Sequence, residues 1–595
     1  MTAFAAIVWP SGSAPDRDIE EHASHALSEL GEQPACLTRA PGCTLLLSPL
    51  HRSDPAGPVQ GVSAIAAGQV LLEDRDALSR TLNADGEHDI SIVLAAYDRW
   101  RRECTRHLTG EYAFALWNPT RRELLAARDG FGIRLLYAAR APRALIVSNV
   151  LAAACFEPSI TAEIDEAAMA AFLANGGPLD PVRTIYRNVR LVPAGHTLSV
   201  TPDGPTLSRH WDFPRPEIRH GRAQVILEGY RAALTSAVLD RSRDLGTIFL
   251  SGGIDSGTLA ACISNIGASR AVHAVTATHD RFSTIDELSF ARLTAEATRL
   301  SLTPVSGDAH AALDGLFDSP SSPEPLDEPA LADWRAFLGA ACRNGTAALY
   351  GEDGDAIFQP PSLPSLRTSE SARQIGLAIS AYVASHRRLP YLGLRLRERL
   401  GIRRPPGVAA PCWLTPHAVR ALETGPAALL ECEPVPATIS DARPDAQRRL
   451  GTQISRDLAA LCAPETSRQR LELRFPLLDT RVVSYVMSIP PIPWCQHKAL
   501  PRAAFASRLP ESVLRRPKTG VHGFSEAIVD DWRRRWRGDV PALPAPFDGW
   551  IDNHHLTHAL REGSAMDAMM AWRVFELAAW LERRRVPRRF EVARV

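Results

Sequence analysis

The sequence predicts an α/β protein with two domains, and three observations support this prediction. Residues 1–214 contain short β-prone runs that are broken by Gly, Pro and Asp. From residue 223 onward, β-prone runs alternate with helical patterns, as is typical of a parallel sheet. Residues 246–262 form an apolar run that passes through a Ser-Gly-Gly turn directly into a helical pattern. A chain of 595 residues has room for two to four domains.

Composition and charge exclude several classes of protein. Basic and acidic residues balance at 67 each, so bulk charge does not favour binding to nucleic acid or to an acidic membrane. The ten cysteines are scattered without a C-x-x-C pair, which suits a reducing compartment and argues against a zinc ribbon or a disulfide framework. The N-terminal run has no basic region, and no apolar run approaches 18 residues. We therefore expect a cytoplasmic protein with no membrane span.

The first 215 residues are predicted to form one domain of mainly β structure. The turn and strand signals place its elements in order along the chain. These elements are a first strand at residues 1–10, a helix near 90–102, and strand runs at 108–118, 123–137 and 185–196.

After a polar linker at residues 215–222, a second domain is predicted for residues 220–595. Its elements are a helix at 223–239, the strand, turn and helix at 246–262, a strand at 271–278, a helix at 286–299 and a strand at 346–350. In such a sheet, ligands bind at the carboxyl ends of the strands. Residues 360–464 form an irregular, proline-rich helical insert, and we expect this insert to select the substrate.

The turn after the strand near residue 248 has the composition of an anion-binding loop. Two glycines let the main chain approach a ligand, serine hydroxyls can donate hydrogen bonds, and the amides at a helix start favour negative charge. A carboxylate among these donors would repel phosphate unless a divalent cation lay between them, so Mg²⁺ and a second acidic residue are implied. No Walker sequence is present. The predicted loop residues are Ser251, Gly252, Gly253, Ile254, Asp255 and Ser256.

Ser-Gly-Gly-Ile-Asp-Ser resembles the pyrophosphate loop of enzymes that cleave ATP to AMP and pyrophosphate, and most closely that of the asparagine synthetase family. The stretch from Gly351 to Phe358 is similar to the family's Gly-Glu-Gly-Gly-Asp-Glu-Leu-Phe, with departures at Asp353 and Ala356. The resemblance implies that Gly351 contacts ATP and that Asp355 is the second acidic residue, which would hold Mg²⁺ together with Asp255.

Further along the chain, residues 472–479 are close to the family's Glu-x-Arg-x-Pro-Phe-Leu-Asp. Lys518 occupies the position of the family lysine that contacts the phosphates and the acyl intermediate, where a cation would stabilise developing charge. Glu352 is a candidate for accepting the amine proton. Lys498 and Arg502 are expected to be structural or to line the phosphate path.

The N-terminal domain resembles the family's glutaminase domain, which is a sandwich of two antiparallel sheets between helices. The family's nucleophilic cysteine is replaced by Thr2, the Asn-Gly pair is absent near residues 64–74, and only a remnant of His-Arg-Gly-Pro-Asp remains at residues 51–54. We expect a degenerate domain that kept its fold and lost glutamine hydrolysis. An N-terminal threonine can itself act as a nucleophile, so this alternative stays open.

Two features near the C-terminus could suggest other ligands. His554 and His558 have a spacing that could hold a metal, but no Glu follows the first His, and a polar helix face explains them. Residues 532–537 and 583–589 are basic with interleaved aromatics, which favours amphipathic helices over a nucleic-acid site and leaves an acidic peptide partner open.

The source of the attacking amine separates three interpretations. The length, the degenerate N-terminal domain and the divergent insert are most similar to lasso peptide cyclases. These adenylate an Asp or Glu side chain of a precursor peptide, join it to the peptide's N-terminal amine, and act with a leader peptidase and a leader-binding protein. The β-lactam synthetase group is the alternative, since residues 518–522 are similar to its Lys-x-Gly-Val-His, although it has a tyrosine in place of Glu352. A catalytically inactive peptide-binding scaffold is the third.

Overall fold

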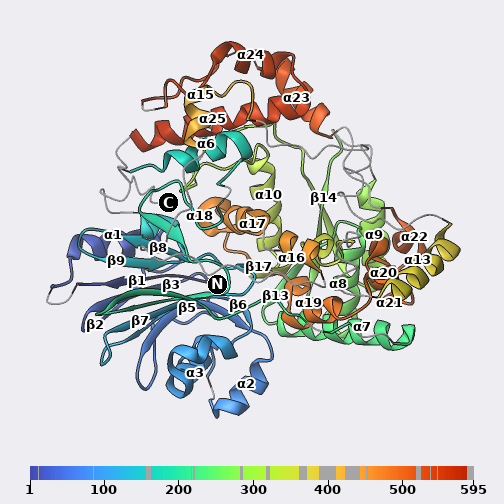
Figure 1. The fold of residues 1–595 in the computed structure, drawn as a ribbon, viewed down its shortest axis with the longest axis horizontal. Helices are drawn as coiled ribbons and strands as arrows, with labels where there is room; N and C mark the ends of the chain where they lie inside the picture. The colour runs from blue at the N-terminus through green and yellow to red at the C-terminus, as the bar shows by residue number, and fades with distance from the viewer. Residues whose placement is uncertain are drawn as a thin grey trace.

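Figure 1 shows the fold of the protein in a computed structural model. The structure describes residues 1–10, 13–84, 86–155, 163–178, 180–215, 217–218, 221–281, 286–316, 322–360, 371–387, 410–422, 443–450, 453–517, 524–536, 538–545 and 547–585.

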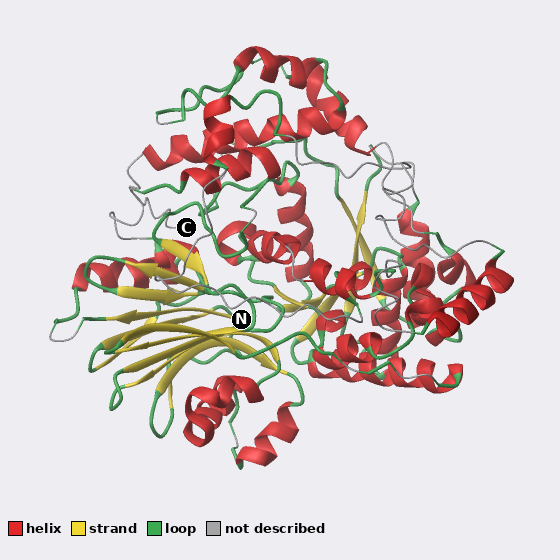
Figure 2. Ribbon diagram, viewed as in Figure 1, coloured by secondary structure: helices red, strands yellow, loops and turns green. Residues whose placement is uncertain are grey.

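The N-terminal half contains two six-stranded antiparallel sheets that lie face to face (Figure 2). The first sheet has the order β10-β8-β9-β1-β3-β2 and the second has the order β12-β11-β7-β6-β5-β4. The strands are β1 (Thr2–Val8), β2 (Cys36–Ala40), β3 (Cys43–Pro49), β4 (Val59–Gln60), β5 (Ile65–Leu72), β6 (Gly110–Asn118), β7 (Glu123–Arg128), β8 (Tyr137–Arg140), β9 (Leu145–Ser148), β10 (Val189–Leu191), β11 (His196–Thr201) and β12 (Gly204–Arg209).

Strict alternation of side chains builds four layers from these sheets. In β1, Phe4 and Ala6 enter the core between the sheets, whereas Ala5 and Ile7 face the helices on the outer side. In β6, Trp117 joins the inner core, and its neighbours along the strand pack against α3. The predicted sandwich is therefore confirmed. Its helices are α1 (Arg17–Ser28), α2 (Arg75–Leu82), α3 (Asp89–Trp100), α4 (Leu151–Ala154) and α6 (Glu166–Asn175).

The C-terminal half is built on a parallel sheet of five strands with the order β15-β14-β13-β16-β17. The strands are β13 (Leu245–Phe249), β14 (His273–Thr278), β15 (Ser301–Ser306), β16 (Ala347–Leu349) and β17 (Glu472–Arg474). The helices next to it in sequence are α7 (Ala223–Asp240), α8 (Ile254–Asn265), α9 (Glu287–Thr298), α10 (Leu331–Cys342) and α11 (Gly354–Ile357). The helices and strands predicted between residues 223 and 350 are present, with ends that differ by a few residues. Much of the predicted insert at 360–464 and residues 586–589 of the last predicted helix lie outside the described residues.

The remaining helices complete the C-terminal half. They are α13 (Ala372–His386), α15 (Pro416–Ala421), α16 (Pro444–Leu450), α17 (Gln453–Cys462), α18 (Pro464–Ser467), α19 (Thr480–Met487), α20 (Pro491–Trp494), α21 (Ala499–Ala504), α22 (Glu511–Arg515), α23 (Phe524–Arg535), α24 (Asn553–Arg561) and α25 (Ala565–Arg585). Helix α25 packs against α23, α24 and the N-terminal α6 (Figure 1). None of the helices in the described ranges is long and apolar enough to cross a membrane.

A buried cluster of charges joins the two halves. Arg241 follows α7, is 1% exposed, and forms ion pairs with three carboxylates: Glu73 at 3.2 Å, Glu111 at 2.7 Å and Asp479 at 2.7 Å. Glu472 accepts from Arg134 at 3.1 Å. Glu472, in the stretch 472–479, therefore forms an ion pair that crosses to the N-terminal half.

Candidate active site

The loop between β13 and α8 holds the predicted anion-binding residues at the carboxyl end of the central strand. Gly252 has a φ of +69°, and a Cβ at this position would lie 2.7 Å from the main-chain nitrogen of Ala291 in α9. Glycine is therefore required both by the backbone conformation and by the close contact with α9. The anion-binding loop therefore packs against the first half of α9, the helix that follows β14.

Some polar groups of this loop are placed to bind an anion, and others hold the loop in its conformation. The hydroxyls of Ser251 and Ser256 lie 3.2 Å apart, and Ser256 also donates to the carbonyl of Gly253 at 3.3 Å. Thr258 is buried and donates to the carbonyl of Asp255 at 2.8 Å, which is a structural role. Gly253 is the N-cap residue of α8 and provides no side chain to cap it. The first amides of α8 are thus placed to bind an anion, as predicted for Ile254 and its neighbours.

A second loop, which follows β16, packs directly on the first. A Cβ on Gly351 would lie 3.1 Å from the main-chain nitrogen of Ser256. A Cβ on Gly354 would lie 2.4 Å from Cγ of Asp255. These two glycines allow the loops to touch, and this contact brings Asp355, the first residue after Gly354, next to Asp255.

The two carboxylates meet at a single cation, the ammonium group of Lys498. Its Nζ forms an ion pair with Asp255 and lies 2.7 Å from Oδ1 of Asp355. Burial lowers the pKa of Lys498, but the two carboxylates outweigh this effect and raise it. Carboxylate oxygens that converge on one positive charge fit the ligand set of Mg²⁺, which takes one or two carboxylates beside phosphate oxygens.

Lys498 was expected to be structural or to line the phosphate path, and its pairing with both site carboxylates is the feature that was not predicted. Lys498 lies in sequence 243 residues from Asp255, at the start of α21, and no local motif marks it. One signal was available. The sequence contains two lysines among its 67 basic residues, Lys498 and Lys518, and all the others are arginines. A chain that uses arginine almost everywhere retains lysine where a compact point charge is needed.

Lys518 itself lies outside the described residues. Arg516, two residues earlier, donates to the carbonyl of Ser251 at 3.2 Å and to Glu287 at 3.2 Å. Its guanidinium also lies 4.6 Å from the ring of Phe290. The chain therefore reaches the anion-binding loop just before Lys518.

Glu352 lies between the two site glycines of the second loop and is partly exposed. It accepts a hydrogen bond from the hydroxyl of Tyr350, whose pKa is raised by burial and, to a lesser degree, by Glu352. The neighbouring Asp353 has a φ of +66°, which explains why the resembling family has glycine at this position. Burial and the charge of Glu352 raise the pKa of Asp353 to about 7.

The other candidate residues occupy separate places. The hydroxyl of Thr2 donates to the carbonyl of Gly68 at 2.7 Å, and this residue is 3% exposed. In α24, His555 pairs with Asp552 at 3.0 Å and His558 pairs with Glu562 at 3.2 Å. Within the described ranges, Asp552, His554 and His555 form the one group of three side chains spaced to hold a metal, and the two histidines are exposed.

Two family models match the chain. The model described as asparagine synthase matches residues 229–582, and the model described as glutamine amidotransferase domain matches residues 71–211. The second match begins beyond Thr2 and beyond the remnant at residues 51–54.

Known proteins with similar sequences carry related names. Asparagine synthetase [glutamine-hydrolyzing] 3 of Bacillus subtilis (strain 168) is 26% identical over 32% of this chain and 32% of its own length. A putative asparagine synthetase of Mycobacterium tuberculosis (strain ATCC 25618 / H37Rv) is 29% identical over 52% of this chain and 49% of its own. Amidase chyE of Penicillium rubens is 26% identical over 56% and 53%. The chain thus spans between a third and about half of the length of these relatives.

Proposed function

The chain belongs to the asparagine synthase family, and we propose that it is a member that closes a ring in a peptide. Enzymes of this family form amide bonds with ATP and release AMP. The observation that supports the ATP-dependent step of the proposal is the convergence of Asp255 and Asp355 on one cation beside the Ser-Gly-Gly loop.

In the proposed reaction, an Asp or Glu side-chain oxygen of the peptide attacks the α-phosphorus of ATP, and pyrophosphate leaves. The peptide's N-terminal amine then attacks the acyl carbon, AMP leaves, and Glu352 takes up the amine proton. The loop residues 251–256 and Gly351 bind the phosphates through main-chain amides and hydroxyls. Exclusion of water is the main task of the rest of the site, because hydrolysis of the acyl-adenylate competes with ring closure.

Asp255 and Asp355 are the residues that would hold Mg²⁺, which when bound neutralises phosphate charge. Lys498, which lies beside these carboxylates, would supply positive charge near the pyrophosphate, and Lys518 would contact the phosphates and the acyl group. Both lysines supply positive charge where negative charge develops.

Two observations favour an internal amine over ammonia from glutamine. The position of the family's nucleophilic cysteine holds Thr2, whose hydroxyl is buried and already donates to Gly68. The glutamine amidotransferase match also starts at residue 71, beyond that position. We therefore propose that a precursor peptide is the substrate, and that a leader peptidase and a leader-binding protein act with the enzyme.

Mass spectrometry of a precursor peptide tests this function. The peptide is taken from the same genomic neighbourhood and incubated with the enzyme, its peptidase partner, ATP and Mg²⁺. Loss of one water from the leaderless peptide, together with AMP, is expected for the enzyme but not for the Asp355→Asn variant. AMP without a dehydrated peptide would move the assignment to a small-molecule ring or an external amine. Equal results for both proteins would contradict the metal site.

A further inference from the structure

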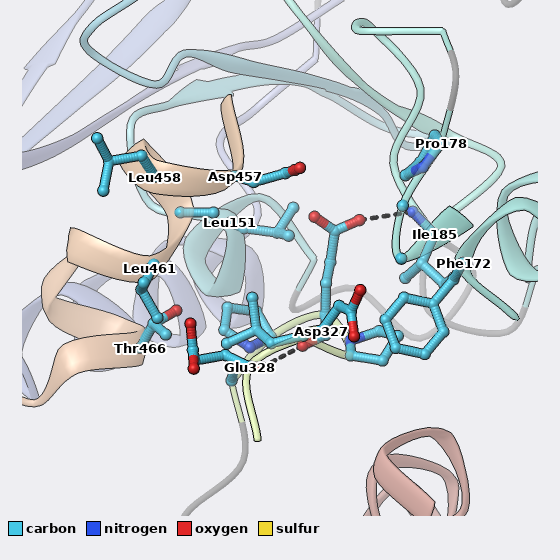
Figure 3. Close-up of a pocket in the computed structure, with 18 of the residues that line it drawn as sticks. Leu151, Phe172, Pro178, Ile185, Asp327, Glu328, Asp457, Leu458, Leu461 and Thr466 are labelled. Carbon is cyan, nitrogen blue, oxygen red and sulfur yellow. Dashed lines mark hydrogen bonds between the residues drawn. The ribbon is translucent and has the colours of Figure 1, made fainter. Parts of the chain in front are cut away.

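The cavity between the N-terminal and C-terminal halves is separate from the candidate active site. Its volume is about 330 Å³, and Figure 3 shows Leu151, Phe172 and Leu458 on its walls. Its acidic groups include Asp327, which pairs with Arg573 of α25 at 2.8 Å. None of the described residues of the candidate active site lines this cavity. The geometry of the active site therefore depends on the contacts that its own segments make.

Lys498 lies in a turn whose backbone conformation is strained. Lys498 has a φ of 55°, and His497, the residue before it, has a φ of 51°. Residues other than glycine rarely adopt this left-handed region, because their Cβ approaches the following carbonyl oxygen. Such residues persist only where the surrounding structure holds them, and they are frequent at functional sites. Contacts from neighbouring segments must therefore hold this turn in place.

Arg502 of α21 makes a contact of this kind. Its Nε donates to the carbonyl of His497 at 2.8 Å. Its other two nitrogens donate to the carbonyls of Leu514 and Arg516, the latter at 2.9 Å. Because all three nitrogens of the planar guanidinium are engaged, its orientation is fixed. The carbonyl of His497 is thus held from a rigid group.

Both ends of this contact are anchored in the C-terminal half. Leu500 and Phe505, on either side of Arg502, are fully buried in the core. The side chain of Arg516, whose carbonyl accepts from Arg502, itself donates to the carbonyl of Ser251 at 3.2 Å. Arg502 therefore links the turn that carries Lys498 to a segment that contacts the anion-binding loop.

We propose that Arg502 is a positioning residue for Lys498. By holding the carbonyl of His497, it keeps the left-handed turn in the conformation that places the ammonium group between Asp255 and Asp355. Since its three nitrogens donate to main-chain carbonyls, Arg502 acts through Lys498 and not on the phosphates. This inference rests on the ATP-dependent step of the proposed function and is independent of which amine attacks.

Chemical modification of Lys498 tests this placement without any turnover of the enzyme. The whole protein is treated with acetic anhydride, and mass spectrometry of its peptides follows the acetylation of Lys498 with time. The side chain is 15% exposed and paired with two carboxylates, so it should react slowly. We expect acetylation to be roughly tenfold faster in Arg502→Gln, as for loss of one charged hydrogen bond. Arg508→Gln, at an exposed residue, is the matched control and should leave the rate unchanged.

A glycine substitution in the turn distinguishes loss of positioning from loss of folding. Glycine adopts the left-handed region without strain, and His497 is exposed. When combined with Arg502→Gln, His497→Gly should therefore restore much of the slow acetylation of Lys498. A general loss of stability would not be corrected by this change. An unchanged rate in Arg502→Gln, or no restoration by His497→Gly, would overturn the proposal.

The rate of AMP formation with the precursor peptide gives a second test. Arg502→Gln should lower kcat by about a hundredfold, because misplacement by about 1 Å has effects of this size. The double variant with Lys498→Gln should be no slower than Lys498→Gln alone, since the effects of coupled residues do not add. Additive losses would reject the positioning role. If the unmodified protein forms no AMP while the acetylation results hold, the proposed function fails and the role of Arg502 stands.

Discussion

Lys498 places one compact positive charge between two carboxylates from different loops. Its Nζ forms an ion pair with Asp255 and lies 2.7 Å from Oδ1 of Asp355. A guanidinium can also pair with several carboxylates, as Arg241 does, but it is larger, planar and fixed in its geometry, so it would place its charge differently.

Substitutions of Lys498 can test whether the site needs only a positive charge at this position or also the compact shape of the ammonium group. We expect both Lys498→Gln and Lys498→Arg to lower ATP-dependent pyrophosphate release by about a hundredfold, within the range found for loss of one group that stabilises a transition state. Arg515→Lys is the matched control, because that side chain is 79% exposed. Full activity of Lys498→Arg would show that any positive charge suffices.

The contact between the two site loops also depends on the absence of a side chain at Gly354. In the Gly354→Ala variant, a Cβ would lie 2.4 Å from Cγ of Asp255, so one of the two loops must move. We expect a loss of pyrophosphate release of about a hundredfold, because misplacement by about 1 Å has effects of that size. In Gly376→Ala, the added Cβ meets nothing within 4 Å in α13, so activity should be unchanged. Equal activities of the two variants would place Asp255 outside the site.

At the scale of elements, α18 and α4 meet through one carboxyl group. Glu465 of α18 accepts from the first two amides of α4, and so joins a helix of the C-terminal half to one of the N-terminal half. Burial raises its pKa from 4.5 to about 7. The folded protein therefore binds the proton more tightly than the unfolded chain does.

The raised pKa of Glu465 determines the direction in which this group changes the free energy of unfolding as the pH rises. The contribution of Glu465 is fully present below pH 4.5 and is lost as pH rises through 7, by at most about 3 kcal/mol. Other buried groups titrate in the same range, so the informative quantity is the difference between the protein and its Glu465→Gln variant. In urea unfolding between pH 4.5 and 7, stability should fall less steeply for the variant. Parallel profiles would show that Glu465 keeps an ordinary pKa.

Local chemistry made most of the elements and part of the site predictable. The strand, turn and helix around Ser251 are encoded within a few residues, and the rule that ligands bind at the ends of parallel strands placed Asp355 near Asp255. The pairing of Lys498, the ion pairs of Arg241 and the cavity between the halves arise from residues far apart in sequence. Their positions depend on how the two halves pack, which no local pattern encodes.

At the scale of the whole molecule, Arg241 holds the halves together from a buried position. Its three carboxylate partners come from β6, from the residue after β5, and from the residue before α19. Breaking a buried pair leaves uncompensated charges, which is far more costly than loss of a surface pair.

We therefore expect Arg241→Ala to lower the free energy of unfolding by about 3–5 kcal/mol. The matched control is Arg243→Ala, since that side chain is 48% exposed and lies 3.4 Å from Asp89. It should cost about 0–1 kcal/mol. Urea unfolding followed by tryptophan fluorescence measures both. A small effect at Arg241 would mean that the halves are held mainly by apolar contacts.

The order of the parallel sheet also bears on how such an enzyme can diversify. Strands β16 and β17 are direct neighbours, although the chain between Leu349 and Glu472 separates them in sequence. Because the entropy of closing a loop grows only with the logarithm of its length, doubling that length costs about 0.6 kcal/mol. The predicted insert at residues 360–464, which we expect to select the substrate, can therefore change in length at little entropic cost while Asp255 and Asp355 keep their places at the strand ends.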